Sequence, residues 1–292
     1  MWFNSYRAPH KNPRLGEFIL DLSSANIKEF NKPIDIALDA VYEITKNNPP
    51  PYTLLASGGV DSQAMIYVWK LSGIPFRVVH YNYLGLNSHD TEFLIKFCQL
   101  HQVNYEIIDF DAVGFITSDL LKVYAKKYDC SSPQILTYMK FIEQHTETVI
   151  MSGNVYYGEG LGINYTIFGL DRFREKTKSN YIPFFFCSTP SITFLPKYLT
   201  LPNSLPVTSD GNTETYSRKC EIFNQLGLTV IAQPTKYTGF EKIKELFDNV
   251  DVPTLLRIRY KSYVSKRPFD ILYRYSLYEH ITLYNDQTRV II

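Results

Sequence analysis

The stretch "LLASGGVDSQ", residues 54–63, places two adjacent glycines between serine and valine-aspartate, directly after an apolar run. The chain has only 14 glycines in 292 residues, so a pair at this point needs a local reason. The preceding text, "YTLLA" at 52–56, is short, apolar and preceded by prolines, which is typical of a strand buried on both faces. The following text, 61–71, carries apolar residues at helical spacing and ends before Gly73. A strand, a glycine turn and a helix are therefore predicted.

The neighbouring text repeats this alternation. Further strands are expected at "FRVVHYNY" (76–83), "NYEIIDF" (104–110) and "ETVIMSG" (147–153). Helices are expected at 32–47, at 89–102 and over 115–145, the last with a break near 131–133. Strands that alternate with helices of this length form parallel sheets joined by right-handed crossovers. The predicted fold class is α/β, with a parallel doubly wound sheet and helices on both faces.

The pattern changes after Gly162. Residues 181–206 are rich in proline and aromatic residues and have no helical period, which predicts an irregular segment packed on the core. Two helices are expected at 215–227 and 238–250, and a hairpin at 280–292, although its turn lacks the favoured glycine. The predicted organisation is a helical lead-in (1–48), an α/β core (49–165), and a mainly helical or irregular C-terminal extension (166–292) that completes the core and the substrate site.

The composition excludes several classes of protein. Hydrophobic residues make up 45% and charged residues 20%, as in folded domains. The formal charge of +1 gives little general attraction to nucleic acid or to an acidic membrane. The four cysteines are scattered without a C-x-x-C pair, which favours reduced thiols over a zinc cluster or a disulfide framework. We find no signal-peptide core or membrane-spanning run, so a soluble, cytoplasmic protein without a membrane partner is predicted.

The glycine turn has the features of an anion site. Gly58 and Gly59 permit left-handed backbone and close approach to a ligand, and the start of the next helix adds partial positive charge. The hydroxyls of Ser57 and Ser62 can donate to phosphate oxygens, whereas Asp61 needs a cation between itself and a phosphate, for which Mg²⁺ is suited. The alternative is a tight helix start in which Asp61 is only a favourable first-turn charge. The buried strand before the turn and the amphipathic helix after it favour the phosphate site.

The text S-G-G-x-D-S at 57–62 differs from other phosphate loops, because it has neither the lysine of G-x-x-x-x-G-K-[ST] nor the spacing of G-x-G-x-x-G. It resembles the loop of the N-type ATP pyrophosphatases, the PP-loop family, whose members include asparagine synthetase, NAD synthetase and 7-cyano-7-deazaguanine synthase. The resemblance covers about residues 50–165. It implies a Rossmann-like fold of the HUP type and binding of ATP with Mg²⁺. It also implies that a substrate oxygen attacks the α-phosphate, that pyrophosphate leaves on the loop, and that a nucleophile then displaces AMP.

The resemblance implies roles for particular residues. The ATP and pyrophosphate cradle would be Ser57, Gly58, Gly59, Val60, Asp61 and Ser62. Because ligands lie outside the carboxyl ends of parallel strands, His80, Tyr81 and Asn82 would lie near the adenosine, with ordinary strand-end packing as the alternative. The text "MSGNVYYGEG" at 151–160 resembles the second glycine-containing segment of the family. Gly153 and Asn154 would contact the nucleotide there, and Glu159 would hold the metal together with Asp61.

In several members of the family a later lysine or arginine neutralises charge that develops on the α-phosphate, a task suited to a preorganised cation. This chain offers two basic clusters, "DRFREKTK" at 171–178 and "YKSYVSKRPF" at 260–269. We predict Lys176 and Lys266 as candidates from these clusters, to act with Asp61 and Ser62 in catalysis. A solvated surface is the alternative for both clusters.

The leading functional prediction is an ATP-dependent ligase that adenylates an oxygen of a small-molecule acceptor for attack by a nitrogen nucleophile. Position 2 is Trp2 rather than cysteine, and too few residues precede the loop for a glutamine-hydrolysing domain. Ammonia would then be free or delivered by a partner. The scattered cysteines disfavour the thiolating members and the zinc-containing 7-cyano-7-deazaguanine synthase.

Two alternatives stay open. The first is modification of a nucleobase or a tRNA, including sulfur transfer, for which the 23 tyrosines and the basic text at 256–275 would form a stacking and phosphate-contacting surface. Buried aromatics with a solvated basic rim account for the same text, so nucleic acid is not the favoured partner. The second is a nucleotide-binding homologue without catalysis, which the intact Asp61 disfavours. Assembly into a homo-oligomer is left open by the sequence.

Overall fold

The computed structural model describes residues 4–7, 18–21, 30, 32–128, 133–152, 155–157, 163–165, 181–185, 188–189, 192, 213–233, 239–240, 242–243, 281–285 and 288–291. Five predicted site residues lie outside the described residues: Gly153, Asn154, Glu159, Lys176 and Lys266. Most of the helix expected at 238–250 and the basic text at 256–275 lie outside them as well.

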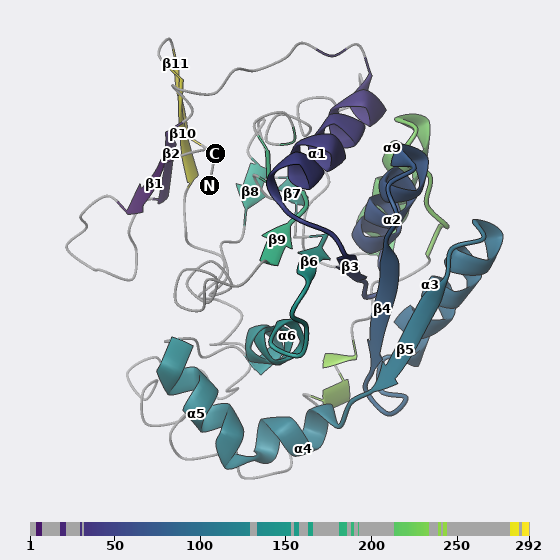
Figure 1. Cartoon of the computed structure of the whole chain (residues 1–292), viewed down its shortest axis with the longest axis vertical. Coiled ribbons are helices and arrows are strands. Elements are labelled where there is room, and N and C mark those ends of the chain that lie inside the picture. Colours follow the sequence, from purple (N-terminus) through teal and green to yellow (C-terminus); the bar gives the residue numbers. More distant parts are fainter. Residues whose placement is uncertain are drawn as a thin grey trace.

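A five-stranded, all-parallel sheet forms the centre of the described part, with the strand order β5-β4-β3-β6-β9 (Figure 1). The strands are β3 (Tyr52–Leu55), β4 (Arg77–Asn82), β5 (Tyr105–Asp109), β6 (Thr148–Met151) and β9 (Tyr181–Pro183). The first four were predicted and are confirmed. The fifth was predicted as irregular, and that prediction is wrong. β9 has only three residues and ends in a proline, so its extended form comes from pairing with β6 and not from a local pattern.

Helices connect the strands. They are α1 (Pro33–Asn47), α2 (Val60–Ser72), α3 (Ser88–Leu100), α4 (Ala112–Thr117), α5 (Asp119–Tyr128), α6 (Pro133–Ile142) and α9 (Thr213–Gln225). The predicted helices at the positions of α1, α2, α3 and α9 are confirmed. The text at 115–145 forms three helices, of which the last begins at the predicted break. A further break at Ser118 was not predicted. The backbone of Ser118 is extended, and its hydroxyl donates to the carbonyl of Phe115.

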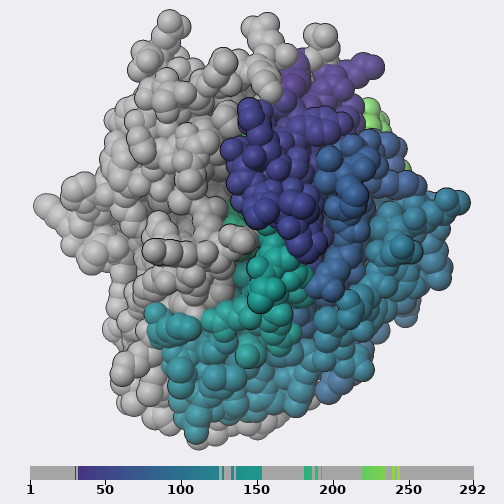
Figure 2. Space-filling view, in the orientation of Figure 1, coloured from purple at the N-terminus to yellow at the C-terminus, as the bar shows by residue number. Residues whose placement is uncertain are grey.

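Successive residues of each central strand enter two different cores. Leu54, Val78 and Ile150 pack in one cluster with residues of α1, α2, α3 and α9, and Leu55, Val79 and Val149 pack in a second cluster with residues of α4, α5 and α6. Figure 1 shows α1, α2 and α9 on one side of the strands and α4 to α6 on the other. In Figure 2, α1 (purple) lies at the upper middle of the visible face, and α4 to α6 (teal) run along its lower edge. The predicted fold class, a parallel sheet covered on both faces, is confirmed.

A second, smaller sheet joins the two ends of the chain. β1 (Asn4–Arg7) pairs with β2 (Phe18–Asp21), and β10 (Ile281–Asn285) pairs with β11 (Thr288–Ile291) as the predicted hairpin. β10 also pairs with β2 in parallel. The lead-in, predicted as helical, therefore contains two strands besides α1. They were not predicted, because the pairing of β2 with the far end of the chain has no signature in local sequence. β7 (Val155–Tyr157) and β8 (Ile163–Tyr165) form a separate antiparallel pair. Among the described residues, every helix is too short or too polar to span a membrane.

The order of the strands marks one position as special. From β3 the chain adds β4 and β5 on one side of the sheet, and β6 and β9 follow on the other side. Parallel sheets of this kind bind ligands in the crevice outside the carboxyl ends of their strands, at the point where the order reverses. That point lies between β3 and β6. The loop that follows β3 is the S-G-G-x-D-S loop.

Candidate functional site

The loop between β3 and α2 has the backbone conformation that its glycine pair predicts. Gly58 has a φ of 97°, in the left-handed region, and Gly59 is the extended N-cap residue of α2. A Cβ atom at position 58 would lie 2.0 Å from the carbonyl oxygen of Asp90, at the start of α3. Position 58 thus requires glycine for two independent reasons. Gly59 offers no side chain to cap α2, so the positive end of the helix dipole faces the loop.

The two serines of the loop contact each other. The N–H of Ser57 donates to Oγ of Ser62 at 3.1 Å, and the two hydroxyl oxygens also lie 3.1 Å apart. Oγ of Ser57 accepts a hydrogen bond from the N–H of Gly59 at 3.3 Å. A hydroxyl hydrogen can rotate toward a better acceptor. Both side chains can therefore hold the loop closed and donate to an anion bound there.

Two glutamine side chains, neither of them predicted, bind the carbonyl oxygen of Gly58. Nε2 of Gln63 donates to it at 2.7 Å, and Nε2 of Gln233 donates to it at 2.8 Å. Oε1 of Gln63 accepts a hydrogen bond from the N–H of Ile231 at 2.8 Å, which ties the segment after α9 to the start of α2. Both glutamines are buried, so these bonds satisfy groups that water does not reach. Gln63 directly follows the motif, but Gln233 lies 175 residues after Gly58, in text without a pattern that indicates a contact with the loop.

Lys219 of α9 forms an ion pair with Asp61. Its Nζ donates to Oδ2 of Asp61 at 2.8 Å and lies 2.7 Å from Oδ1. The two side chains are only 11% and 19% exposed, and Nζ also lies 5.4 Å from the centre of the Phe223 ring. The predicted cations Lys176 and Lys266 fall outside the described residues and stay predictions. A signal for Lys219 existed in its spacing of one helical turn from Phe223, which belongs to the buried face of α9.

The carboxylate of Asp61 fits a divalent metal in part. Its Oδ1 is buried and close to Nζ of Lys219, yet it accepts no aligned hydrogen bond. A carboxylate oxygen with that free capacity is a suitable ligand for Mg²⁺. Within the described ranges, no three side chains of His, Cys, Asp or Glu gather into a complete metal site. A metal at Asp61 would need further ligands, such as phosphate oxygens and the predicted Glu159.

His80 supports the loop from within the core. Its Nδ1 lies 2.8 Å from the carbonyl oxygen of Ala56, and its Nε2 lies 2.8 Å from Oγ1 of Thr91. Burial lowers the pKa of His80, although the bond to the Ala56 carbonyl opposes this. The neutral ring then donates through Nδ1 to the carbonyl of Ala56 and fixes this residue, which directly precedes the loop. The predicted contact of His80 with adenosine stays a prediction, and its side chain has a structural task here.

Tyr81 and Asn82 differ in their exposure. The ring of Tyr81 is buried on the other face of the sheet and stacks on Phe141 with ring centres 3.8 Å apart. Burial raises the pKa of Tyr81 to about 12. Asn82 is partly exposed at the carboxyl end of β4, and its side chain bonds Asp109 at 2.6 Å and the N–H of Gly85 at 3.1 Å. Of the three predicted adenosine neighbours, Asn82 is the one whose side chain a ligand can reach. The predicted roles of Tyr81 and Asn82 stay predictions.

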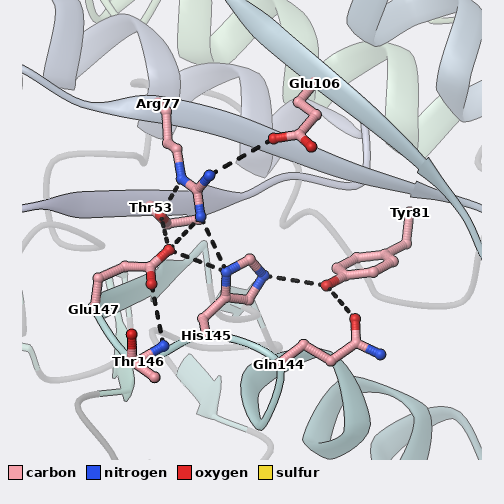
Figure 3. A network of polar contacts seen from close by, with 8 residues as sticks. All are labelled: Thr53, Arg77, Tyr81, Glu106, Gln144, His145, Thr146 and Glu147. Atoms are coloured by element: carbon pink, nitrogen blue, oxygen red, sulfur yellow. Dashed lines mark hydrogen bonds and ion pairs between the residues drawn. The ribbon is translucent and has the colours of Figure 1, made fainter.

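A second polar cluster lies at the opposite, amino-terminal edge of the sheet (Figure 3). Oε1 of Glu147 accepts a hydrogen bond from Thr53 at 2.6 Å, pairs with Arg77, and lies 3.0 Å from Nδ1 of His145. Burial raises the pKa of Glu147, but the hydrogen bonds from Thr53, its own backbone, Arg77 and His145 outweigh it and lower the pKa to about 2. This cluster fastens the starts of β3, β4 and β6, away from the loop.

Fold and loop together define a class, an α/β protein whose first crossover carries an S-G-G-x-D-S loop at the switch point of a parallel sheet. No model of a known protein family matches the chain, and no curated protein matches its sequence. Solved structures do match it. The chain is similar to an NMN synthetase from Francisella tularensis, at 14% identity, with 85% of this chain and 94% of that chain covered and a TM-score of 0.37.

Two other solved structures are similar over comparable lengths. One is an NH3-dependent NAD synthetase from Campylobacter jejuni, at 16% identity, with 85% of this chain and 93% of that chain covered and a TM-score of 0.35. The other is the U34-tRNA thiolase NcsA from Methanococcus maripaludis, at 14% identity, with 84% and 89% covered and a TM-score of 0.33.

Proposed function

We propose that the chain binds ATP at the S-G-G-x-D-S loop and transfers the adenylyl group to an oxygen of a small-molecule acceptor. The observation that best supports this is the loop itself. A left-handed glycine, an uncapped helix start and an Asp61–Lys219 pair meet at the switch point of the sheet. Helix starts of this kind bind phosphate through backbone N–H groups and the helix dipole.

The reaction follows from where charge would develop. The acceptor oxygen attacks the α-phosphorus, the bond from that phosphorus to the bridging oxygen breaks, and pyrophosphate leaves with the bonding electrons. The start of α2 and the hydroxyls of Ser57 and Ser62 would hold the leaving pyrophosphate. Lys219, which brings a buried positive charge to the same loop, would offset the negative charge of the phosphates. A nitrogen nucleophile, ammonia or a donated equivalent, would then displace AMP from the acceptor.

Mg²⁺ held by Asp61, with Glu159 as a further proposed ligand, would neutralise phosphate oxygens and favour departure of pyrophosphate. The loop is prepared for these contacts before any ligand arrives. Gln63 and Gln233 both hold the Gly58 carbonyl, so the glycine backbone cannot turn without breaking two buried hydrogen bonds. Preorganised donors of this kind cost no rearrangement when the charge develops.

Two measurements test the proposal. The first is equilibrium dialysis of ATP with Mg²⁺ against the wild-type protein and Gly58→Ala, in which only the wild-type protein should bind. The second is a screen of pooled carboxylic acids with ammonia, in which one pool should yield AMP and pyrophosphate in equal amounts. Formation of ADP and phosphate, or ATP binding that Gly58→Ala leaves unchanged, would contradict the proposal.

A further inference from the structure

Nζ of Lys219 lies beside both oxygens with which Asp61 would hold a metal. It lies 2.7 Å from Oδ1 and 2.8 Å from Oδ2 of the carboxylate. Mg²⁺ binds oxygen at about 2.0–2.1 Å and repels a second cation at the same oxygens. A divalent cation at either oxygen would therefore lie beside the ammonium, so the two cations weaken each other's binding to the carboxylate of Asp61.

Lys219 cannot simply turn away into water. Its side chain is 11% exposed, and its Nζ lies near the ring of Phe223. A buried ammonium that loses its anion carries a large desolvation cost unless another anion takes it over. The phosphates of a nucleotide at the start of α2 would be such an anion, because Asp61 belongs to the first turn of that helix.

We infer that Lys219 keeps divalent metal off Asp61 until nucleotide phosphates accept its ammonium, so that metal and nucleotide bind this loop cooperatively. The inference rests on the proposed binding of phosphates at the loop. It adds an order to that function: the loop has weak affinity for metal alone and gains affinity once the nucleotide has drawn Lys219 from Asp61. Coupling between two ligands at one site commonly amounts to about 5–150-fold in affinity.

The test is a titration with Mn²⁺ in which free Mn²⁺ is followed by electron paramagnetic resonance. Without nucleotide, Lys219→Met should bind Mn²⁺ at least about tenfold more tightly than the wild-type protein does. Lys219→Arg keeps the charge and should stay weak. Lys122→Met, a matched control that breaks the surface pair with Asp119, should also leave the affinity unchanged. Adding Asp61→Asn to Lys219→Met should remove the gain.

A non-hydrolysable ATP analogue completes the experiment. It should tighten Mn²⁺ binding in both proteins, because its phosphates add ligands to the metal, but by a larger factor in the wild-type protein than in Lys219→Met, where no ammonium has to leave Asp61. Equal Mn²⁺ affinity of the wild-type protein and Lys219→Met without nucleotide, or a gain that survives Asp61→Asn, would overturn the inference. Should Lys219→Met fail to fold by circular dichroism, Lys219→Gln and the nucleotide dependence of the wild-type protein decide the matter. Failure of the proposed function looks different, because the analogue would then not bind the wild-type loop at all.

Discussion

Lys219 follows Asp61 by 158 residues, yet its ammonium lies 2.8 Å from the Asp61 carboxylate. The same part of the chain contributes Gln233, which holds the Gly58 carbonyl. The six residues of the loop thus determine its backbone shape. The region around α9 adds a positive charge through Lys219 and a supporting hydrogen bond through Gln233. A protein that ended after β6 would keep the motif and lose both contacts.

The pair of Lys219 and Asp61 can be tested for its contribution to stability. Asp61→Asn leaves a mostly buried ammonium without its anion, so we expect a loss of about 1–3 kcal/mol in the free energy of unfolding. Lys219→Met in the same chain should restore most of this loss, because it removes the unpaired charge and keeps the packing against Phe223. Urea unfolding followed by circular dichroism measures both. Additive losses in the double variant would show that the two side chains do not interact.

Gly58 should be far more sensitive to substitution than another left-handed glycine. Gly58→Ala places a Cβ 2.0 Å from the Asp90 carbonyl oxygen, so the loop and the start of α3 must move apart. Gly73→Ala is the matched control: its φ is 72°, but a Cβ there meets nothing within 4 Å. We expect about 1–2 kcal/mol of destabilisation from the backbone strain in Gly73→Ala, with ATP binding unchanged. Gly58→Ala should lose ATP binding in equilibrium dialysis, and equal binding by the two variants would argue against the loop as the ATP site.

The sequence was informative wherever structure is local. The text around Gly58 and Gly59 predicts the turn, and the strand patterns at β3, β4, β5 and β6 predict the parallel sheet, because each signal lies within one element. β9 escaped prediction since three residues ending in Pro183 carry no strand pattern. Its pairing with β6 alone determines its conformation.

In the candidate site, too, the local residues were predicted and the distant ones were not. The S-G-G-x-D-S motif indicates the loop residues, but a motif says nothing about which distant side chains reach it. The two basic clusters predict Lys176 and Lys266 as cations of the site, whereas the described cation at Asp61 is Lys219, a single lysine at the edge of the buried face of α9. His80 shows the reverse case, a polar residue at a strand end whose side chain is used within the core.

The two glutamines should matter for ATP binding without touching ATP. Gln233→Ala removes one of two donors from the Gly58 carbonyl and leaves a buried acceptor less well satisfied, at a cost of about 1–3 kcal/mol in stability. The unbound loop should then relax into other conformations, and binding ATP must reverse that relaxation. If the relaxation stabilises the unbound loop by roughly 1.4 kcal/mol, the affinity for ATP should fall about tenfold. Gln99→Ala, at an exposed position on α3, is the control and should change neither quantity. A stable Gln233→Ala protein with wild-type ATP affinity would show that this support is dispensable.

Glu147 should give the protein a component of stability that disappears in acid. Its pKa in the fold is about 2, below the value of about 4.3 for an unstructured glutamate, so the ionised form is the one that the fold favours. The stabilisation is fully present above the unfolded pKa and is lost as the pH falls through the folded pKa. The free energy of unfolding of the wild-type protein should exceed that of Glu147→Gln at pH 5 and pH 7 by a similar amount. The difference should shrink toward pH 2, because Arg77 then faces a neutral side chain in both proteins.

Asp119→Asn, which removes a carboxylate that is 90% exposed, should show a much smaller difference throughout. A gap between wild type and Glu147→Gln that is independent of pH would mean that the carboxylate acts by shape and hydrogen bonding alone, without its charge.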